Sequence, residues 1–255
     1  MDVPGNWWES FFSGVAVDMW IQAIPAAVTQ LEADLIVKLL EPEAGAALLD
    51  VPCGAGRLAI ALSDRGYAVT GVDLSEESLV HARRSSGHVA WERRDMRDLP
   101  WRGAFSGAYC FGNSFGYLDD EGNETFLRSV AAALTSRGRF VLETPMVAES
   151  ALLTVKERGW WKVGDIHLLA ANRFDPPTGR METEYTFVSN GRVDVRYGTH
   201  RLYTYRQLVE LMRAAGFSEI DTWTRDHQPG SSGEGAGLAP YRVGAQTLLL
   251  VGRVG

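Results

Sequence analysis

The 255-residue chain lacks the residues that mark several common classes of protein. It has two cysteines, Cys53 and Cys110, which are too few for a disulfide framework or a cysteine-rich zinc site and favour a reducing, cytoplasmic location. We therefore expect no bound metal. No apolar run approaches the roughly 18 residues that a membrane span requires. The N-terminus has tryptophans and acids where a secretory signal has basic and apolar segments.

Clusters of basic residues are missing as well. Lysine occurs only as Lys38, Lys156 and Lys162, the arginines are scattered, and the formal net charge is -7. A nucleic-acid binder needs clustered cations to neutralise phosphates, so neither DNA nor RNA is an expected partner. No membrane association is expected either, and nothing in the sequence indicates the oligomeric state.

What the chain does contain is an alternation of short apolar runs with helical patterns. Five strands are predicted at 46–52, 67–72, 89–92, 105–111 and 139–143. Helices are predicted between them at 57–65, after an N-cap at Ser75, and at about 121–134. This alternation is typical of βαβ units, which build a parallel sheet.

The pattern changes after the fifth strand. Between about residues 147 and 200, apolar and polar side chains alternate on both sides of the dipeptide Asn190-Gly191. Asparagine followed by glycine is typical of a two-residue hairpin turn. This segment therefore predicts an antiparallel insert.

Helical spacing returns near the C-terminus. Thr204 and Gln207 form the pattern of a capping box, which begins a helix. Two last strands are predicted at 217–223 and 246–251. The residues between them, 229–239, are rich in glycine and serine and predict a mobile loop.

The strongest chemical signal is the turn Asp50-Val-Pro-Cys-Gly54-Ala-Gly56, which leaves the first strand and opens a helix. Glycines there allow a tight turn and a close approach of the backbone to a ligand. Asp73 ends the second strand, where a carboxylate can accept hydrogen bonds from both hydroxyls of a ribose. Together these residues predict a nucleoside-containing ligand.

The identity of that ligand is open from the turn alone, because the same features fit an NAD(P)-dependent oxidoreductase. Asp50 favours a different ligand, since its charge would repel a pyrophosphate but suits an ammonium group. Asp95 and Met96 follow the third strand and can contact an adenine ring. The Tyr-x-x-x-Lys pair of short-chain oxidoreductases is absent. A non-catalytic binding subunit is a third reading.

Several segments resemble the motifs of the class I S-adenosylmethionine (SAM)-dependent methyltransferases. The resemblance implies a Rossmann-like α/β fold, with a doubly wound, mostly parallel seven-stranded sheet whose last strand is antiparallel and an antiparallel insert after the fifth strand. SAM would lie across the ends of the first strands. The segments are 49–57, 69–75, 95–100, 111–117, 138–143 and 214–217.

The resemblance also implies a single domain over residues 1–255. Its parts are an N-terminal helical lid (1–40), a SAM-binding core (46–146), an insert that covers the acceptor site (147–200), and a C-terminal helix with the last two strands (201–255). The aromatic N-terminal segment is open to two interpretations, a docking face or a lid over the ligands. Carried over by position, the cofactor-binding residues are Asp50, Cys53, Gly54, Gly56, Arg57, Asp73, Leu74, Asp95, Met96, Phe111 and Asn113.

The insert resembles the antiparallel segment that covers the acceptor site in family members that act on small amines, sugars and secondary metabolites. The expected activity is therefore methyl transfer from SAM to a nitrogen or oxygen atom of a small-molecule acceptor. Such a transfer mainly requires alignment in a dry pocket, and a hydroxyl acceptor gains from a base. The candidate catalytic residues are His167, Tyr117 and Asn113. Further candidates for the acceptor pocket are Trp160, Trp161, His200 and Tyr203.

Overall fold

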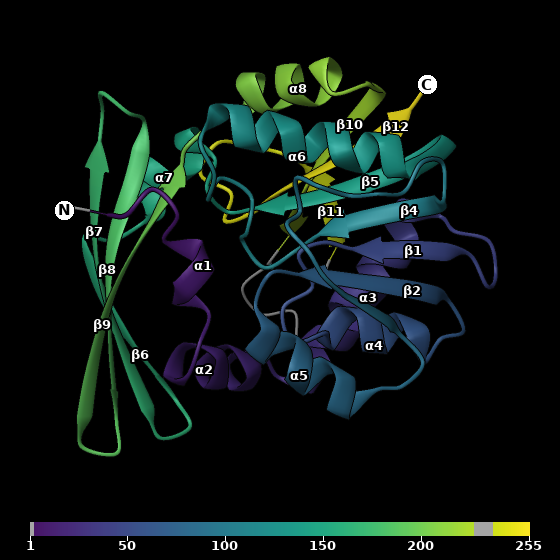
Figure 1. Ribbon diagram of the computed structural model, residues 1–255. Coiled ribbons are helices and arrows are strands. Elements are labelled where there is room, and N and C mark those ends of the chain that lie inside the picture. The colour runs from purple at the N-terminus through teal and green to yellow at the C-terminus, as the bar shows by residue number, and fades with distance from the viewer. Residues whose placement is uncertain (1–2, 227–236) are drawn as a thin grey trace.

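The computed structural model describes residues 3–226 and 237–255, which form two sheets and their flanking helices (Figure 1). The helices are α1 (Trp8–Phe11), α2 (Val15–Ala23), α3 (Ala26–Leu40), α4 (Arg57–Ser63), α5 (Glu76–Ser85), α6 (Asp120–Ala133), α7 (Ala148–Thr154) and α8 (Tyr205–Ala214). The strands of the larger sheet are β1 (Ala47–Asp50), β2 (Ala68–Asp73), β3 (Ala90–Arg93), β4 (Phe105–Cys110), β5 (Leu134–Thr144), β10 (Phe217–Asp226), β11 (Gly237–Pro240) and β12 (Leu248–Val254). The smaller sheet has β6 (Arg158–Val163), β7 (Ile166–Asp175), β8 (Arg180–Ser189) and β9 (Arg192–Arg201).

The larger sheet has the order β11-β10-β12-β5-β4-β1-β2-β3. Strands β1 to β5 pair in parallel, and β12 is antiparallel to both β5 and β10. This confirms the doubly wound, mostly parallel α/β fold, and confirms that its last strand, β12, is antiparallel. The order reverses between β1 and β4, which opens a crevice at the carboxyl ends of these strands.

The predicted count of seven strands is wrong by one, because β11 adds an eighth strand to the edge of β10. Residues 237–239, which were included in the predicted mobile loop, belong to this strand. Residues 229–236 of that loop lie outside the described residues. The segment Gly-Leu-Ala-Pro has no alternation of apolar and polar residues, so its pairing depends on the neighbouring edge rather than on its own pattern.

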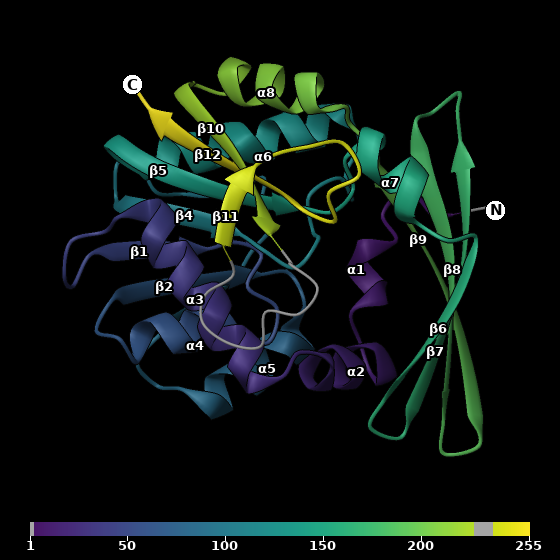
Figure 2. The same ribbon diagram turned by 180° about the vertical axis from the view of Figure 1, so that it is seen from behind.

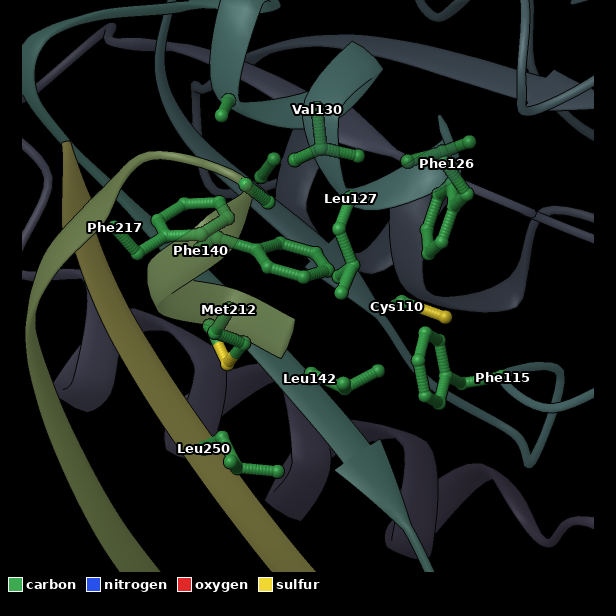
Figure 3. Packing of buried hydrophobic residues seen from close by; sticks show 14 of the residues in the cluster. Cys110, Phe115, Phe126, Leu127, Val130, Phe140, Leu142, Met212, Phe217 and Leu250 are labelled. Atoms are coloured by element: carbon green, nitrogen blue, oxygen red, sulfur yellow. The ribbon is translucent and has the colours of Figure 1, made fainter. Parts of the chain in front are cut away.

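Two buried clusters cover the two faces of the larger sheet. On one face α6 and α8 pack against β5, β10 and β12, and the rings of Phe140 and Phe217 stack with centroids 5.7 Å apart (Figure 3). On the other face α3 and α4 cover β1 and β4 (Figure 2). Adjacent residues such as Leu48 and Leu49 point to opposite faces, as expected for a strand that is buried on both sides.

The insert is a separate four-stranded antiparallel sheet, with Asn190 and Gly191 both at positive φ in the turn that joins β8 to β9. Helices α1 and α2 lie between this sheet and the larger one (Figures 1 and 2). Their buried side chains pack on the inner face of β7 and β8, with Phe11 and Met19 against Leu168 and Phe187. Helix α3 instead packs on the larger sheet, so only α1 and α2 of the segment 1–40 lie next to the insert.

Candidate active site

A pocket of about 570 Å³ lies at the carboxyl ends of β1, β2 and β4, between the larger sheet and the N-terminal helices. It has two parts, which we call the acidic half and the aromatic half. Asp50, Asp73 and Asp95 lie in the acidic half. The aromatic half is lined by residues of α1 and α2, of the loop after β4, and of the insert. Its members include Trp7, Trp8, Phe11, Phe12, Trp20, Asn113, Tyr117, Tyr185 and His200.

The turn after β1 presents its backbone to the acidic half. Gly54 has a φ of 54°, and no atom lies within 4 Å of the position that a Cβ would take. The backbone is therefore open to a ligand at this residue. Gly56 was predicted to border the ligand but does not line the pocket. Its φ is 82°, and a Cβ there would lie 2.3 Å from Trp91, so this glycine permits packing between the turn and β3.

Asp73 at the end of β2 is held by the backbone around it. One carboxylate oxygen accepts from the Gly54 N–H at 2.8 Å, and the other accepts from the Ser75 N–H at 2.8 Å. Burial raises the pKa of Asp73, and these hydrogen bonds oppose that effect. Each oxygen retains a further lone pair, so the carboxylate can accept two more hydrogen bonds from a ligand diol.

Asp50 at the end of β1 is 2% exposed. Burial raises its pKa to about 8, and the nearby Arg57 guanidinium opposes this only in part. A buried carboxyl of this kind is costly to ionise without a partner. A cationic group of a ligand in the acidic half would lower that cost.

Asp95 follows β3 and forms a two-pronged ion pair with Arg97, with oxygen to nitrogen distances of 3.0 and 2.6 Å. Burial raises the pKa of Asp95, but the hydrogen bonds from Arg97 outweigh it and the net pKa is lowered. The carboxylate is therefore ionised and fixed in orientation. Met96 lines the pocket beside it.

A buried charge network borders the acidic half, and no pattern in the sequence predicts it. Arg225 on β10 contacts Glu32 on α3 at 2.8 Å and also pairs with Glu143 on β5. Glu32 also forms an ion pair with Arg57, with nitrogen and oxygen 2.5 Å apart, and Glu143 accepts from the Gly112 N–H at 3.0 Å. Glu32, Arg57 and Glu143 line the pocket, so the network fixes the position of its charged wall.

The aromatic half contains His200, which was predicted only as a further candidate for the acceptor pocket, after His167. His200 is 2% exposed, and its Nε2 lies 3.1 Å from the carbonyl oxygen of Asn113. Its ring packs edge-on against Tyr117, with centroids 4.7 Å apart. Burial raises the pKa of the Tyr117 phenol, which therefore stays protonated. Asn113, Tyr117 and His200 are thus brought together.

His167 is not part of the pocket, which corrects its prediction as a base. It lies on β7 between Ile166 and Leu168, whose side chains are buried, and its own side chain is exposed. Because neighbouring side chains of a strand point to opposite faces, His167 lies on the outer face of the insert. Trp160 on β6 is exposed as well, opposite Leu169. Tyr203 is buried outside the pocket and donates to Asp120 at 2.7 Å.

Of the predicted cofactor-binding residues, all except Gly56 line the pocket. Two predicted site residues, Gly56 and His167, lie outside the pocket for identifiable reasons. Gly56 faces a tryptophan of the next strand, and His167 points away from the site. Three pocket residues were not predicted. Ser75 lies two residues after Asp73 and was predicted only as a helix cap, whereas Glu32 and Glu143 come from α3 and the end of β5.

The segment between α1 and α2 is hydrogen-bonded on one side to the start of α5 and on the other side to the insert. The Gly14 N–H donates to the Glu77 carboxylate at 2.9 Å, and the Ser75 hydroxyl donates to the Phe12 carbonyl at 2.7 Å. Arg196 on β9 donates to the Ser13 carbonyl at 2.8 Å and also to that of Phe11. These bonds hold the aromatic segment over the pocket, and its role as a lid stays a prediction.

We expect Arg196→Met to loosen this segment. The substitution removes charge-assisted hydrogen bonds to two backbone carbonyls, and such bonds are each worth about 1.5–3 kcal/mol. Amide hydrogen exchange over residues 7–20 should become roughly 10-fold faster or more, while exchange in β1 and β4 should not change. Arg192→Met, at an exposed position on the same strand, is the control. Equal exchange in the two variants would contradict the assignment.

A family model and several known proteins are similar in sequence to parts of this chain. A family model described as a methyltransferase domain matches residues 48–138. The dTDP-3-amino-3,6-dideoxy-alpha-D-glucopyranose N,N-dimethyltransferase of Streptomyces fradiae is 29% identical over 189 residues, which cover 72% of this chain and 74% of that protein. YqeM of Bacillus subtilis (strain 168) is 31% identical over 137 residues. That match covers 51% of this chain and 49% of YqeM, so the chain spans about half the length of this relative.

Solved structures share the fold over nearly the whole chain. The CcbJ methyltransferase from Streptomyces caelestis aligns with a TM-score of 0.76 at 18% identity, covering 96% of this chain and 98% of that one. A SAM-dependent methyltransferase from Clostridium acetobutylicum ATCC 824 aligns with a TM-score of 0.74 at 17% identity, covering 93% and 96%. The arrangement of core and insert is therefore shared with these proteins.

Proposed function

Because this chain belongs to the class I SAM-dependent methyltransferases, we propose that it transfers a methyl group from SAM to a nitrogen or oxygen atom of a small-molecule acceptor. One observation carries the proposal. A single pocket joins three carboxylates at successive strand ends to an aromatic half in which no lining residue is charged, among the residues that the structure describes. The first half suits a nucleoside with a cationic end, and the second suits an apolar acceptor.

The residues of the acidic half fit SAM. Gly54 leaves open space beside the backbone, the buried Asp50 carboxyl suits the ammonium of the methionine part, and Arg57 suits its carboxylate. Asp73 retains lone pairs for the ribose hydroxyls. Asp95 and Met96 would hold the adenine. These roles are proposals that rest on where the side chains lie.

When bound, SAM supplies a methyl group on a sulfonium, which is open to in-line attack by a nucleophile. The contribution of the chain is to align the acceptor and exclude water. The rings of Trp7, Phe12 and Tyr117, with centroids 4.7 to 6.4 Å apart, close the aromatic half on one side. Because the Tyr117 phenol stays protonated, it can donate a hydrogen bond but cannot serve as a base.

The relatives support a small acceptor. The Streptomyces fradiae protein is named for methylation of an amino sugar nucleotide, and CalS10 from Micromonospora echinaspora is described as an amino pentose methyltransferase. No helix in residues 3–226 or 237–255 is long and apolar enough to cross a membrane. Cys53 and Cys110 are both free thiols, which supports the proposal of a reducing, cytoplasmic location.

Calorimetric titration of the purified chain with SAM, S-adenosylhomocysteine and NADH tests the proposal. We expect micromolar binding of the two sulfur ligands and no binding of NADH. Release of S-adenosylhomocysteine in the presence of an acceptor would then distinguish an enzyme from a binding subunit. Binding of NADH in place of SAM would overturn the proposal and favour an oxidoreductase.

Binding of SAM should release a proton at pH 6.5. In the free protein Asp50 is mostly protonated at this pH, because burial raises its pKa to about 8. An ammonium beside Asp50 favours the ionised form, so the bound pKa is lower and the proton leaves. Affinity should therefore rise with pH up to about pH 8 and then level off. Calorimetry in buffers of different ionisation enthalpy measures the proton directly.

The matched variant for this measurement is Asp50→Asn, which keeps the shape of the side chain but cannot ionise. We expect this variant to bind SAM without proton release and with an affinity that is independent of pH between 6 and 8. Proton release that persists in Asp50→Asn would assign the titration to another group. A wild-type affinity that does not change with pH would contradict the pairing of Asp50 with the ammonium.

A further inference from the structure

Three residues of the aromatic half hold polar side-chain atoms that are buried and have no hydrogen-bond partner in the described part of the chain. They are the Nδ1 of His200, the Oδ1 of Asn113 and the Nε1 of Trp7. A buried polar atom without a partner costs about 1–3 kcal/mol. Such atoms at a pocket therefore indicate where the polar atoms of a ligand bind.

The backbone fixes which nitrogen of His200 is free. The carbonyl oxygen of Asn113 can only accept, so the His200 nitrogen beside it, Nε2, carries the proton and donates. The backbone of Asn113 has a φ of 67°, a left-handed conformation that is uncommon for residues other than glycine. The neutral ring then presents Nδ1 as a lone-pair acceptor. The loop after β4 thus sets the tautomer of a histidine on β9.

The surroundings keep the ring neutral. Burial lowers the pKa of His200 to about 4, the hydrogen bond to Asn113 opposes this, and the charge of Arg180 adds to it. The rings of Trp7 and Tyr117 cover the imidazole, with centroids 6.3 and 4.7 Å away. Near neutral pH, Nδ1 is therefore an acceptor and not a donor.

We propose that Nδ1 of His200 accepts a hydrogen bond from the N–H or O–H of the acceptor atom that is methylated. The substrate class is then a primary or secondary amine, or a hydroxyl, carried on an apolar ring. This inference rests on the proposed function and deepens it. In this role His200 selects acceptors whose nucleophilic nitrogen or oxygen carries a hydrogen. The hydrogen bond also orients the acceptor so that the lone pair of that nitrogen or oxygen faces the methyl group of SAM.

The transfer balances for both kinds of acceptor. The lone pair of the nucleophile forms the new bond to carbon, the carbon–sulfur bond breaks, and its electron pair stays on sulfur. A methylated amine is a far stronger base than His200, so it keeps its proton and leaves as an ammonium ion, which must lose that proton to water before it can be methylated again. A methylated hydroxyl is far more acidic than the imidazolium, so its proton passes to Nδ1 and then to water.

A limit on the extent of methylation follows. The reacting amine is the neutral form, which alone has a free lone pair. A neutral primary or secondary amine has an N–H for Nδ1, but a neutral tertiary amine has none. A tertiary amine would leave Nδ1 buried without a partner and would not be oriented by it. Methylation of a primary amine should therefore stop at the tertiary amine, with no quaternary ammonium product.

The first test reads the tautomer directly. Full-length protein labelled with ¹⁵N-histidine and saturated with S-adenosylhomocysteine is examined by two-bond ¹H–¹⁵N NMR between pH 5.5 and 8, and the His200 signals are assigned from their loss in His200→Gln. We expect a neutral ring with the proton on Nε2 throughout this range. His88→Gln, at an exposed position, is the control. A proton on Nδ1, or an imidazolium at pH 7, would overturn the proposal.

The second test uses aniline, N-methylaniline and N,N-dimethylaniline at pH 7.5, where all three are neutral, so they share one apolar ring and differ in their N–H groups. We expect the first two to shift the Nδ1 signal and the third to leave it unchanged. Equal shifts from all three, or none from any, would overturn the proposal. In His200→Gln the amide can still donate to Asn113 but has no atom at the place of Nδ1.

Calorimetry separates this inference from the proposed function. His200→Gln should bind SAM with an affinity within about 3-fold of the wild type, because His200 lies in the aromatic half, while the transfer rate to any active amine should fall at least 10-fold. Loss of SAM binding by the wild type would refute the proposed function and leave the tautomer result standing. An unchanged transfer rate in His200→Gln would refute the inference alone.

Discussion

Replacing Asp73 with alanine is expected to weaken SAM binding by roughly 100- to 10,000-fold. A charged acceptor in a hydrogen bond is worth about 1.5–3 kcal/mol, and a ribose diol would make two such bonds to this carboxylate. Each factor of ten in affinity corresponds to about 1.4 kcal/mol. Calorimetric titration with SAM measures the loss. Asp98→Ala, an exposed aspartate after the next strand, is the control and should bind as the wild type does.

Asp73 also organises the turn, because it accepts from the N–H groups of Gly54 and Ser75. A loss of affinity could therefore come from the backbone rather than from the ribose. Titration with adenosine and 2′,3′-dideoxyadenosine separates the two causes. The wild type should prefer adenosine strongly, and Asp73→Ala should bind the two with similar affinity. A preference for adenosine that survives in the variant would show that another group holds the ribose.

The parallel sheet and the acidic half of the pocket could be predicted from local signals. Apolar runs and helical spacing determine the order of elements, and the carboxyl ends of neighbouring parallel strands meet at one edge. Asp50, Asp73 and Asp95 each follow such a run, so their convergence follows from the alternation alone. The capping residues Ser75 and Thr204 were also predicted, because their hydrogen bonds involve the backbone three residues away.

The choice between two histidines could not be made in the same way. In a strand, a shift of one residue moves a side chain to the opposite face. Which face of the insert is covered depends on where α1 and α2 pack, and this is a contact between distant segments. His167 lies on the outer face and His200 lies against Trp7, although both belong to strands of the same insert.

Ion pairs between residues far apart in the sequence could not be predicted from it either. Glu32 and Arg225 are 193 residues apart, and no spacing rule connects α3 with β10. Gly56 shows a related limit. Its positive φ fits the expected glycine turn, but the close contact that requires a glycine is with Trp91 rather than with a ligand. At Gly56 the residue type correctly indicated a tight turn, but the residue that it contacts is determined by tertiary packing. The same holds for the partners of Glu32 and Arg225.

Replacing Arg225 with methionine is expected to lower the free energy of unfolding by about 3–5 kcal/mol, since removal of one partner leaves buried charges uncompensated. The side chain of Arg225 is 15% exposed, and those of its partners Glu32 and Glu143 are 9% and 10% exposed. Glu32 would keep its contact with Arg57, whereas Glu143 would retain only the Gly112 N–H. Urea denaturation at pH 7 measures the change, with Arg242→Met, at an exposed position, as the control.

The loss should depend on pH with a definite sign. Burial raises the pKa of Glu143, and Arg225 holds it down. Without Arg225 this pKa rises further, so the folded state binds a proton that the unfolded state has already lost. Stability of the variant should therefore fall as pH rises from about 5 to 8, and the difference from the wild type should be largest at pH 8. Arg225→Met combined with Glu143→Gln should recover much of the loss and flatten its pH dependence. A single variant whose loss is the same at pH 5 and pH 8 would show that packing of the arginine stem, rather than its charge, stabilises this side of the pocket.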